Sequence, residues 1–235
     1  MRRPILLAFV LASTGCAISA GQTARTNGEG NVQFGVEPGV LGASTGGFVG
    51  VAPALNLAVR YGVSDTVDLG GRLGTNGLEF QTKFQVTGDD GVIVSPAPSL
   101  EVWFLSIGGV GGGFVGVPLP LLIDVPVGES ALVIGPRVHP RFLFGGGGGA
   151  TASSLSMSAG STLGFAAKVS DGVKIFPEFG FEIPLFATAS GTTTTTTTGT
   201  GTGTGTTTTT TSTAGSGVGG MIFDFRVNIL IGKTK

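Results

Sequence analysis

Side chains alternate between apolar and polar along about ten segments of this chain. In residues 77–87, Leu78, Phe80 and Phe84 alternate with Glu79 and Lys83. Successive side chains of a β-strand point to opposite faces, so this pattern predicts strands with one apolar and one polar face. Turn-forming residues separate the segments. The predicted strands are residues 31–40, 53–62, 66–74, 77–87, 92–105, 114–125, 131–144, 154–169, 173–187 and 218–231.

Composition narrows the fold class further. Mean hydropathy is +0.43 with 11% charged residues, yet no internal apolar run reaches the ~18 residues that a membrane-spanning helix needs. The 44 glycines and many β-branched residues favour short strands and turns over helices. A single cysteine excludes an intramolecular disulfide and a cysteine metal cage. The net charge of −1, without a clustered basic face, argues against nucleic acid as a partner.

The polar faces of the strands hold most of the charged residues beyond residue 30, and the two signs nearly balance. Such a balance favours an enclosed interior in which charges pair, because an unpaired buried charge is costly. The alternative is a β-sandwich whose polar faces are solvated. The predicted interior polar network consists of Glu37, Arg60, Asp68, Arg72, Glu79, Lys83, Glu101, Arg137, His139, Arg141, Lys168, Lys174, Glu178, Glu182, Asp224 and Arg226.

The connections between strands also differ in kind. Those after the second, fourth, sixth and eighth strands are short and polar, whereas most of the others are longer and rich in Gly, Ser, Ala or Thr. Short periplasmic turns and longer outer loops are typical of transmembrane barrels. The sequence therefore predicts an all-β, closed antiparallel up-and-down transmembrane β-barrel of about 10 strands, roughly 8–12.

The N-terminus has the layout of an export signal, with Arg2 and Arg3 before an apolar run and then small residues. Residues 11–16 (Leu-Ala-Ser-Thr-Gly-Cys) resemble a bacterial lipoprotein signal, which implies lipidation at Cys16; cleavage after Ala20 is the alternative. The expected organisation is a signal peptide at 1–15, a flexible tether at 16–30, the barrel at 31–232 with a Thr/Gly-rich outer loop at 188–216, and a tail at 233–235.

Residues 31–232 resemble the small bacterial outer-membrane β-barrel superfamily. Residues 55–65 (Leu-Asn-Leu-Ala-Val-Arg-Tyr-Gly-Val-Ser-Asp) look like a strand entering a periplasmic turn, and residues 223–229 (Phe-Asp-Phe-Arg-Val-Asn-Ile) look like a closing strand. The family often ends in an aromatic residue, whereas this chain ends in Lys235. The resemblance implies placement in the bacterial outer membrane, contact with its lipids and folding by the barrel assembly machinery. It specifies no activity.

Few residues suggest chemistry. His139, the one histidine, suits a general base in lipid-modifying barrel enzymes, but the sequence places no serine or carboxylate beside it, which favours a role in the polar network. The glycine runs 108–113 and 145–149 lack the lysine and helix of a phosphate loop. The Thr-rich tract 192–213 is expected to be disordered or an extension of the last two strands, with adhesion or O-linked sugar as a surface role. No catalytic residue, metal site or cofactor is predicted.

Four functions are consistent with these features. The leading hypothesis is a non-enzymatic outer-membrane barrel with a structural, envelope-anchoring or surface-display role and a plugged polar interior, since about ten strands leave no wide channel. The others are a narrow pore for small solutes, a lipid-modifying enzyme that uses His139, and a lipid-anchored periplasmic β-sandwich. The sequence alone identifies no ligand.

Overall fold

A computed structural model describes residues 20–45, 48–75, 77–107, 109–147, 150–198, 204–216 and 220–232. The strands are β1 (Val32–Thr45), β2 (Phe48–Ser64), β3 (Val67–Gly74), β4 (Gly77–Phe84), β5 (Ile93–Pro96), β6 (Ser99–Ile107), β7 (Val110–Gly116), β8 (Leu119–Val127), β9 (Ser130–Gly147), β10 (Ala150–Ser170), β11 (Val173–Thr198), β12 (Thr204–Ser216) and β13 (Gly220–Gly232). Within these ranges, no helix has the length and apolarity to cross a membrane.

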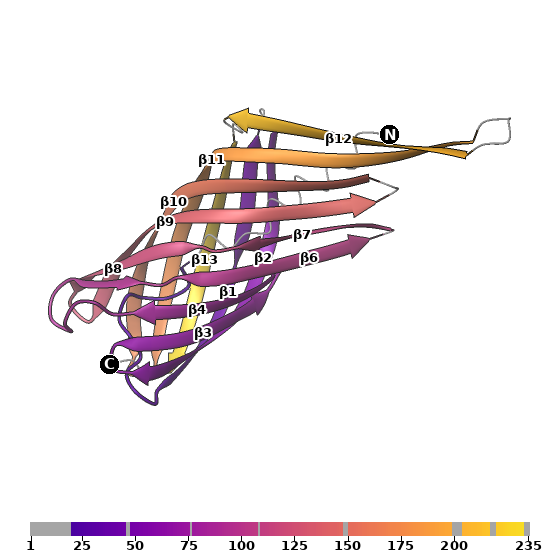
Figure 1. Ribbon diagram of the computed structural model, residues 1–235. Coiled ribbons are helices and arrows are strands. Elements are labelled where there is room, and N and C mark those ends of the chain that lie inside the picture. Colours follow the sequence, from indigo (N-terminus) through magenta and orange to yellow (C-terminus); the bar gives the residue numbers. More distant parts are fainter. Residues whose placement is uncertain are drawn as a thin grey trace.

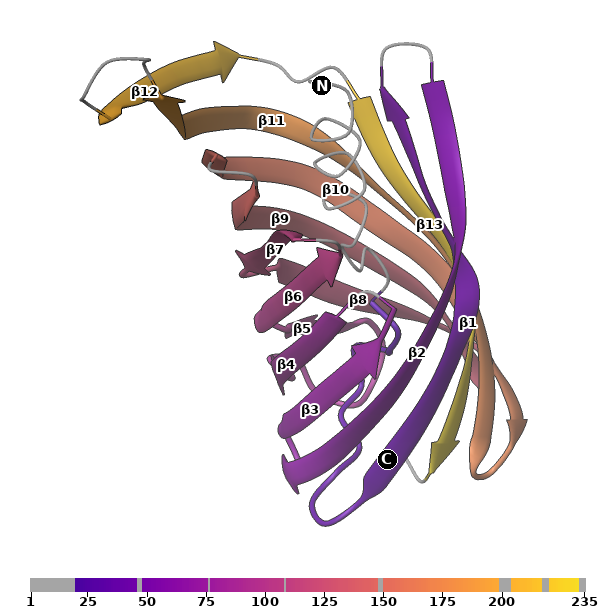
Figure 2. The same ribbon diagram turned by 90° about the vertical axis from the view of Figure 1, so that its right-hand side faces the viewer.

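The sheet closes on itself. Antiparallel pairing runs in order through β1, β2, β3, β4, β6, β7, β9, β10, β11 and β13, and β13 pairs again with β1. These ten strands form the wall of a barrel (Figure 2). The prediction of a closed antiparallel barrel of about ten strands is confirmed. The β-sandwich alternative is wrong, because the strands belong to one continuous sheet.

The fifth and sixth predicted strands are each interrupted near a proline. Residues 92–105 divide into β5 and β6, and residues 114–125 lie in β7 and β8. Pro98 and Pro118 lie at the two breaks, where a proline offers no N–H to the ladder. The break between β5 and β6 is still hydrogen-bonded to the break between β7 and β8. Ala97 N donates to Pro120 O and Ser99 N donates to Pro118 O, both at 3.0 Å.

Several hairpins extend further than the alternation predicts. β1 and β2 pair as far as Thr45 with Phe48, and β9 and β10 as far as Gly147 with Ala150, so most of the expected outer loops are strand. In the tract 188–216, expected as an outer loop whose Thr-rich part is disordered or extends the last two strands, the structure has the extension: β11 pairs with β12 as far as Thr198 with Thr204 and projects past the barrel (Figure 1). Backbone pairing needs no alternation, so Gly-, Ser- and Thr-rich segments continue the ladder.

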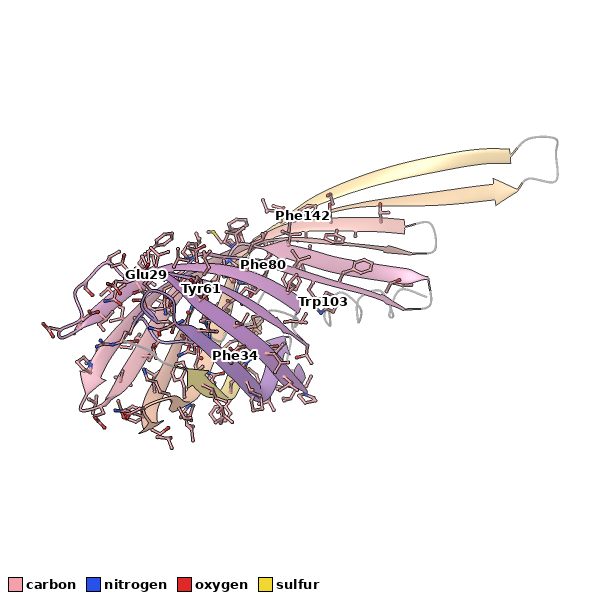
Figure 3. All side chains as sticks on the ribbon, turned by 90° about the horizontal axis from the view of Figure 1, so that it is seen from below. Glu29, Phe34, Tyr61, Phe80, Trp103 and Phe142 are labelled. Carbon is pink, nitrogen blue, oxygen red and sulfur yellow. The ribbon has the colours of Figure 1, made fainter. Side chains whose placement is uncertain are left out.

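The side chains sort as the alternation predicts, with the apolar ones outside. Phe34, Tyr61 and Phe80, labelled in Figure 3, are 56%, 47% and 56% exposed, whereas Asn56 and Arg60 on β2 are 0% and 3% exposed. Among the described residues, 28 buried residues are polar or charged and only 14 are apolar. This distribution is the reverse of a water-soluble domain.

Candidate functional site

The lumen of the barrel holds most of the predicted polar network. Fourteen of its members are buried: Glu37, Arg60, Asp68, Arg72, Glu79, Lys83, Glu101, Arg137, His139, Arg141, Glu178, Glu182, Asp224 and Arg226. Lys168 lies instead at the end of the barrel that holds the tight turns 65–66, 128–129 and 171–172, which we call the turn end. There it pairs with exposed Glu129 at 3.2 Å and Asp171 at 3.0 Å. Lys174 is half-buried and lines, with Arg25, a cavity of about 530 Å³ at the same end.

Ion pairs link six of the buried residues into one group, and Glu178 adjoins it. Arg72 Nε lies 3.0 Å from Glu37 Oε2, and Arg72 Nη1 lies 2.7 Å from Glu79 Oε2. Arg60 and Arg226 approach Glu37 at 3.5 and 3.7 Å. We call these residues the central cluster: Glu37, Arg60, Arg72, Glu79, Glu178, Asp224 and Arg226.

Sheet register explains how the central cluster forms. Arg72 is the direct cross-strand partner of Glu79 on β4, and Glu178 is that of Arg226 on β13. Opposite charges in such positions attract each other across the sheet. Arg226 also contacts its strand neighbour Asp224 at 2.8 Å. The alternation thus fixes which side chains point inward, and the register decides which of them meet.

A second group surrounds His139. Its Nε2 lies 3.3 Å from Glu101 Oε2, and its Nδ1 lies 3.3 Å from Glu182 Oε1. The sequence places no carboxylate beside His139, but the fold does, because β6 and β11 bring these glutamates from distant parts of the chain. Ser158 is its cross-strand partner on β10. Arg141 pairs with Glu182 and also donates to Ser158 Oγ at 3.2 Å.

This second group does not have the geometry of a serine nucleophile and its base. A general base must bind the hydroxyl of the serine that it activates. Here Ser158 Oγ donates to Glu182 Oε2 at 2.8 Å, and both ring nitrogens of His139 face carboxylates. His139 is also 0% exposed. These contacts favour the interpretation of His139 as part of a buried polar network.

The segment from Ala20 to Gly28 lies inside the barrel, and we call it the lumenal segment. All of its residues are buried except half-buried Arg25. The prediction of a flexible tether over 16–30 is wrong for these residues, since they have fixed partners on the barrel wall; residues 16–19 lie outside the described ranges. A segment poor in apolar residues is ordered here because the wall binds its backbone and also the side chains of Gln22, Arg25 and Thr26.

Three wall carboxylates accept hydrogen bonds from backbone N–H groups of the lumenal segment. Glu178 accepts from Ala20 and Gly21, and Asp124 accepts from Ala24 at 2.8 Å and from Arg25 at 3.2 Å. Asp68 accepts from Asn27 with both oxygens at 3.1 Å. Bonds between a charged group and an N–H are stronger than neutral ones. The carboxylates therefore hold the segment at three successive points.

Donors on the wall bind the carbonyl groups of the same segment. Lys83 Nζ donates to Thr23 O at 3.2 Å and to Arg25 O at 2.7 Å, and it also pairs with Asp68 at 3.0 Å. Arg72 donates to Ala20 O at 2.8 Å, and Ser95 donates to Ala24 O at 2.7 Å. The wall thus supplies acceptors for backbone N–H groups and donors for backbone carbonyl groups of the segment, and buried backbone groups need such partners.

The lumenal segment leaves the barrel at the turn end. Gly30 N donates to Gly62 O at 2.8 Å, and Gly62 N donates to Asn31 O at 2.9 Å, which joins the segment to β2. A Cβ on Gly62 would lie 1.9 Å from Gly28 O. Position 62 therefore requires glycine so that the two backbones can approach.

Sequence reasoning missed this segment and one of its anchors. Asp124 is 4% exposed and faces the lumen, but the run Leu121-Leu122-Ile123 before it has no alternation to assign it a face. Within the described ranges, no group of three or more His, Cys, Asp or Glu side chains is arranged to hold a metal ion. The site is thus a set of charged groups that bind each other and a backbone.

Comparisons with known proteins add little beyond the fold. No protein-family model and no curated protein matches the chain. Solved structures of bacterial outer-membrane β-barrels are similar to the chain. Neisserial surface protein A is 8% identical, with 86% of this chain and 99% of that chain covered and a TM-score of 0.44. The translocator domain of the autotransporter NalP from Neisseria meningitidis is 13% identical, with 97% and 95% covered and a TM-score of 0.45.

The outer-membrane protease OmpT from Escherichia coli is also similar, at 8% identity, with 87% of this chain and 95% of that chain covered and a TM-score of 0.44. At these values the likenesses carry no argument about activity. The class of this protein, a closed antiparallel β-barrel with apolar side chains outside and charged ones inside, rests on its own strand pairing and burial.

Proposed function

We propose that this protein is an outer-membrane β-barrel with a structural or surface-display role and a closed lumen. The observation that carries the proposal is the lumenal segment, which is bound on several sides by buried charged groups of the wall. A chain held in this way occupies the path that a solute would take. Solute transport would require these bonds to break together.

The outer surface supports placement in a membrane. Large apolar side chains are exposed around the whole wall, such as Leu57 (56%), Leu73 (62%), Phe104 (64%) and Leu163 (53%). An apolar surface of this extent would drive aggregation in water, whereas hydrocarbon covers it without cost. A closed barrel also leaves no unpaired sheet edge in its lipid-facing wall, which a bilayer requires. Export and the outer-membrane lipids as partners belong to the same proposal.

The ends of the strands support an orientation with the tight turns on the periplasmic side and the β11–β12 hairpin on the cell surface. The lumenal segment leaves the barrel at the end that also holds the tight turns 65–66, 128–129 and 171–172, and β13 finishes there at Gly232. Short turns are typical of the periplasmic side. The β11–β12 hairpin extends from the opposite end, so we assign it to the cell surface (Figure 1). This hairpin is the element that a surface-display role would use.

Planar-bilayer recording of the purified protein tests the closed lumen. The proposal predicts no stepwise ion current under conditions in which a porin of known conductance, added as a control, gives clear steps. Insertion of the protein into the same bilayers is verified by its heat-dependent gel mobility after recovery. Stepwise current from the intact protein would contradict the proposal and favour the narrow-pore alternative.

A further inference from the structure

Three cationic side chains, those of Arg25, Lys168 and Lys174, line the cavity of about 530 Å³ at the turn end. We propose that this cavity binds a phosphate group, with Lys174 and Arg25 as its main ligands. The site goes beyond the proposed function, because a barrel with a closed lumen needs no ligand at its mouth.

Lys174 has cationic and apolar neighbours in the sheet. Its direct cross-strand partner on β10 is Lys168, and its partner on β13 is Leu230. Like charges in directly opposite positions repel each other. The ion pairs described at the turn end join Lys168 to Glu129 and to Asp171, and none of them includes Lys174. A half-buried ammonium group in this position is stabilised by an added anion.

Arg25 brings a second cation to the cavity from the lumenal segment. Its backbone N–H donates to Asp124 Oδ2 at 3.2 Å, which fixes the residue beside the wall. Its side chain is half-buried, and Nη2 donates to Asp89 O at 3.1 Å. A guanidinium group has five N–H donors, so this one contact leaves donors for an oxyanion.

Asp124 is the one buried carboxylate among the residues that line this cavity. Its oxygens accept the N–H groups of Ala24 and Arg25, at 2.8 and 3.2 Å, so it already has hydrogen-bond partners. Arg25 and Lys174 place two positive charges beside this single negative charge. The less exposed part of the lining therefore has one positive charge in excess, which a bound anion balances.

The exposed part of the lining carries the remaining charges. Lys168 pairs there with Glu129 and Asp171, whose side chains are 80% and 99% exposed. Solvent screens charges in such positions, so the two carboxylates oppose an anion in the cavity only weakly. Lys168 adds a third cation at the entrance.

A phosphate group matches this arrangement of cations. A phosphate monoester carries up to about two negative charges and has three strong acceptor oxygens, whereas a carboxylate carries one charge. A guanidinium group binds two such oxygens side by side, and an ammonium group binds them as a point charge. The volume of about 530 Å³ lies in the usual range of small-molecule pockets. Soluble phosphate compounds and phospholipid headgroups both carry the group that this cavity would recognise.

Titration calorimetry of the folded barrel, in a neutral detergent and a low-salt buffer without phosphate, tests the site. Inorganic phosphate should bind saturably, and acetate should bind about tenfold more weakly, because it lacks the second charge and the third oxygen. A short-chain phosphatidic acid distinguishes the two sources. Tighter binding than that of inorganic phosphate would assign the site to a lipid headgroup, and equal or weaker binding would assign it to a soluble phosphate. Saturable binding of neither probe, or equal binding of acetate, would overturn the proposal.

Three variants, each shown to be folded by its heat-dependent gel mobility, locate the site. Lys174→Gln should weaken the binding of phosphate about tenfold, because it removes a charge-assisted hydrogen bond. Glu129→Gln removes an exposed carboxylate of the lining and should strengthen binding roughly twofold. The matched control Glu29→Gln removes an exposed carboxylate that does not line the cavity, and it should leave binding unchanged. Unchanged binding in Lys174→Gln, or an equal gain in Glu129→Gln and Glu29→Gln, would overturn the assignment, since net charge rather than this cavity would then attract the anion.

Discussion

Replacing Arg72 by methionine tests the central cluster most sharply. Arg72 pairs with Glu37 and Glu79 and donates to Ala20 O, and it is 6% exposed. Methionine retains the apolar length of the side chain but removes the charge and every donor. Removing one partner of a buried ion pair typically costs about 3–5 kcal/mol, because the carboxylates that remain are still buried. We expect Arg72→Met to lower the free energy of unfolding by about that amount.

Urea unfolding of the barrel in lipid vesicles, followed by the heat-dependent shift in gel mobility, measures this loss. With a denaturant slope of about 1–3 kcal/mol per molar, the midpoint should fall by at least about 1 M. Glu79→Gln alone should also destabilise the barrel. The double variant should lose less than the sum of the two single variants, because the pair is then removed together.

The matched control is Lys168→Met, which removes a cation whose partners Glu129 and Asp171 are 80% and 99% exposed. Solvent screens this pair, so the midpoint should not move measurably. If Arg72→Met were as silent as this control, or if the Arg72 and Glu79 effects were simply additive, the central cluster would not stabilise the barrel in the way described here.

Three further predictions concern the lumenal segment and the lipid-facing wall. Deleting residues 22–27 should produce stepwise conductance in planar bilayers; a silent deletion variant would show that the segment does not close the lumen. Leu57→Arg, in the middle of β2, should cost about 2–4 kcal/mol of folding free energy in vesicles, and Val51→Arg, nearer the end of the strand, should cost less; equal small costs would argue against a lipid environment. Gly62→Ala should displace the lumenal segment and raise its protease cleavage at least tenfold, whereas Gly71→Ala, with no atom closer than 3.8 Å to the added Cβ, should not; equal protection would contradict the close contact.

The wall of the barrel was predictable because the alternation acts over short distances. The segment 77–87 predicted β4 and its outward Phe80, and 218–231 predicted β13, since each needs only the pleat of a strand. Strand ends were less predictable. Residues 41–52 have no sustained alternation, yet they extend β1 and β2, because backbone pairing between hairpin neighbours does not depend on side chains.

The sequence predicted which charged residues face the interior, but not which of them contact each other. The alternation turns Arg72, Glu79 and Glu37 inward, but contacts such as that of Arg72 with Glu37 depend on register and on curvature across the lumen. His139 shows the limit most clearly. Its two glutamate partners come from strands far apart in the sequence, and no local pattern connects them.

The lumenal segment was not predictable from its own composition. Residues 20–28 lack an apolar pattern, and a segment of this kind ordinarily forms a flexible linker. Its order comes from Glu178, Asp124 and Asp68, which bind backbone groups that every sequence has. The predicted inward faces carry seven carboxylates and eight Lys or Arg side chains, so their charge gives no sign of an internal partner. An excess of buried carboxylates appears only in the structure, where Asp124 is buried and Lys168 and Lys174 are not.

Nitroxide scanning along β2 most directly tests whether apolar side chains face lipid while charged ones line a filled lumen. Single-cysteine variants from position 53 to 61, in a Cys16→Ala background and in vesicles, carry the label. Collision rates with membrane-soluble oxygen should peak at 55, 57 and 59 and fall at 56, 58 and 60, with low access for a water-soluble nickel complex throughout. Nickel access that peaks at 55, 57 and 59 would show that these side chains face water, and the lipid-facing barrel would be refuted.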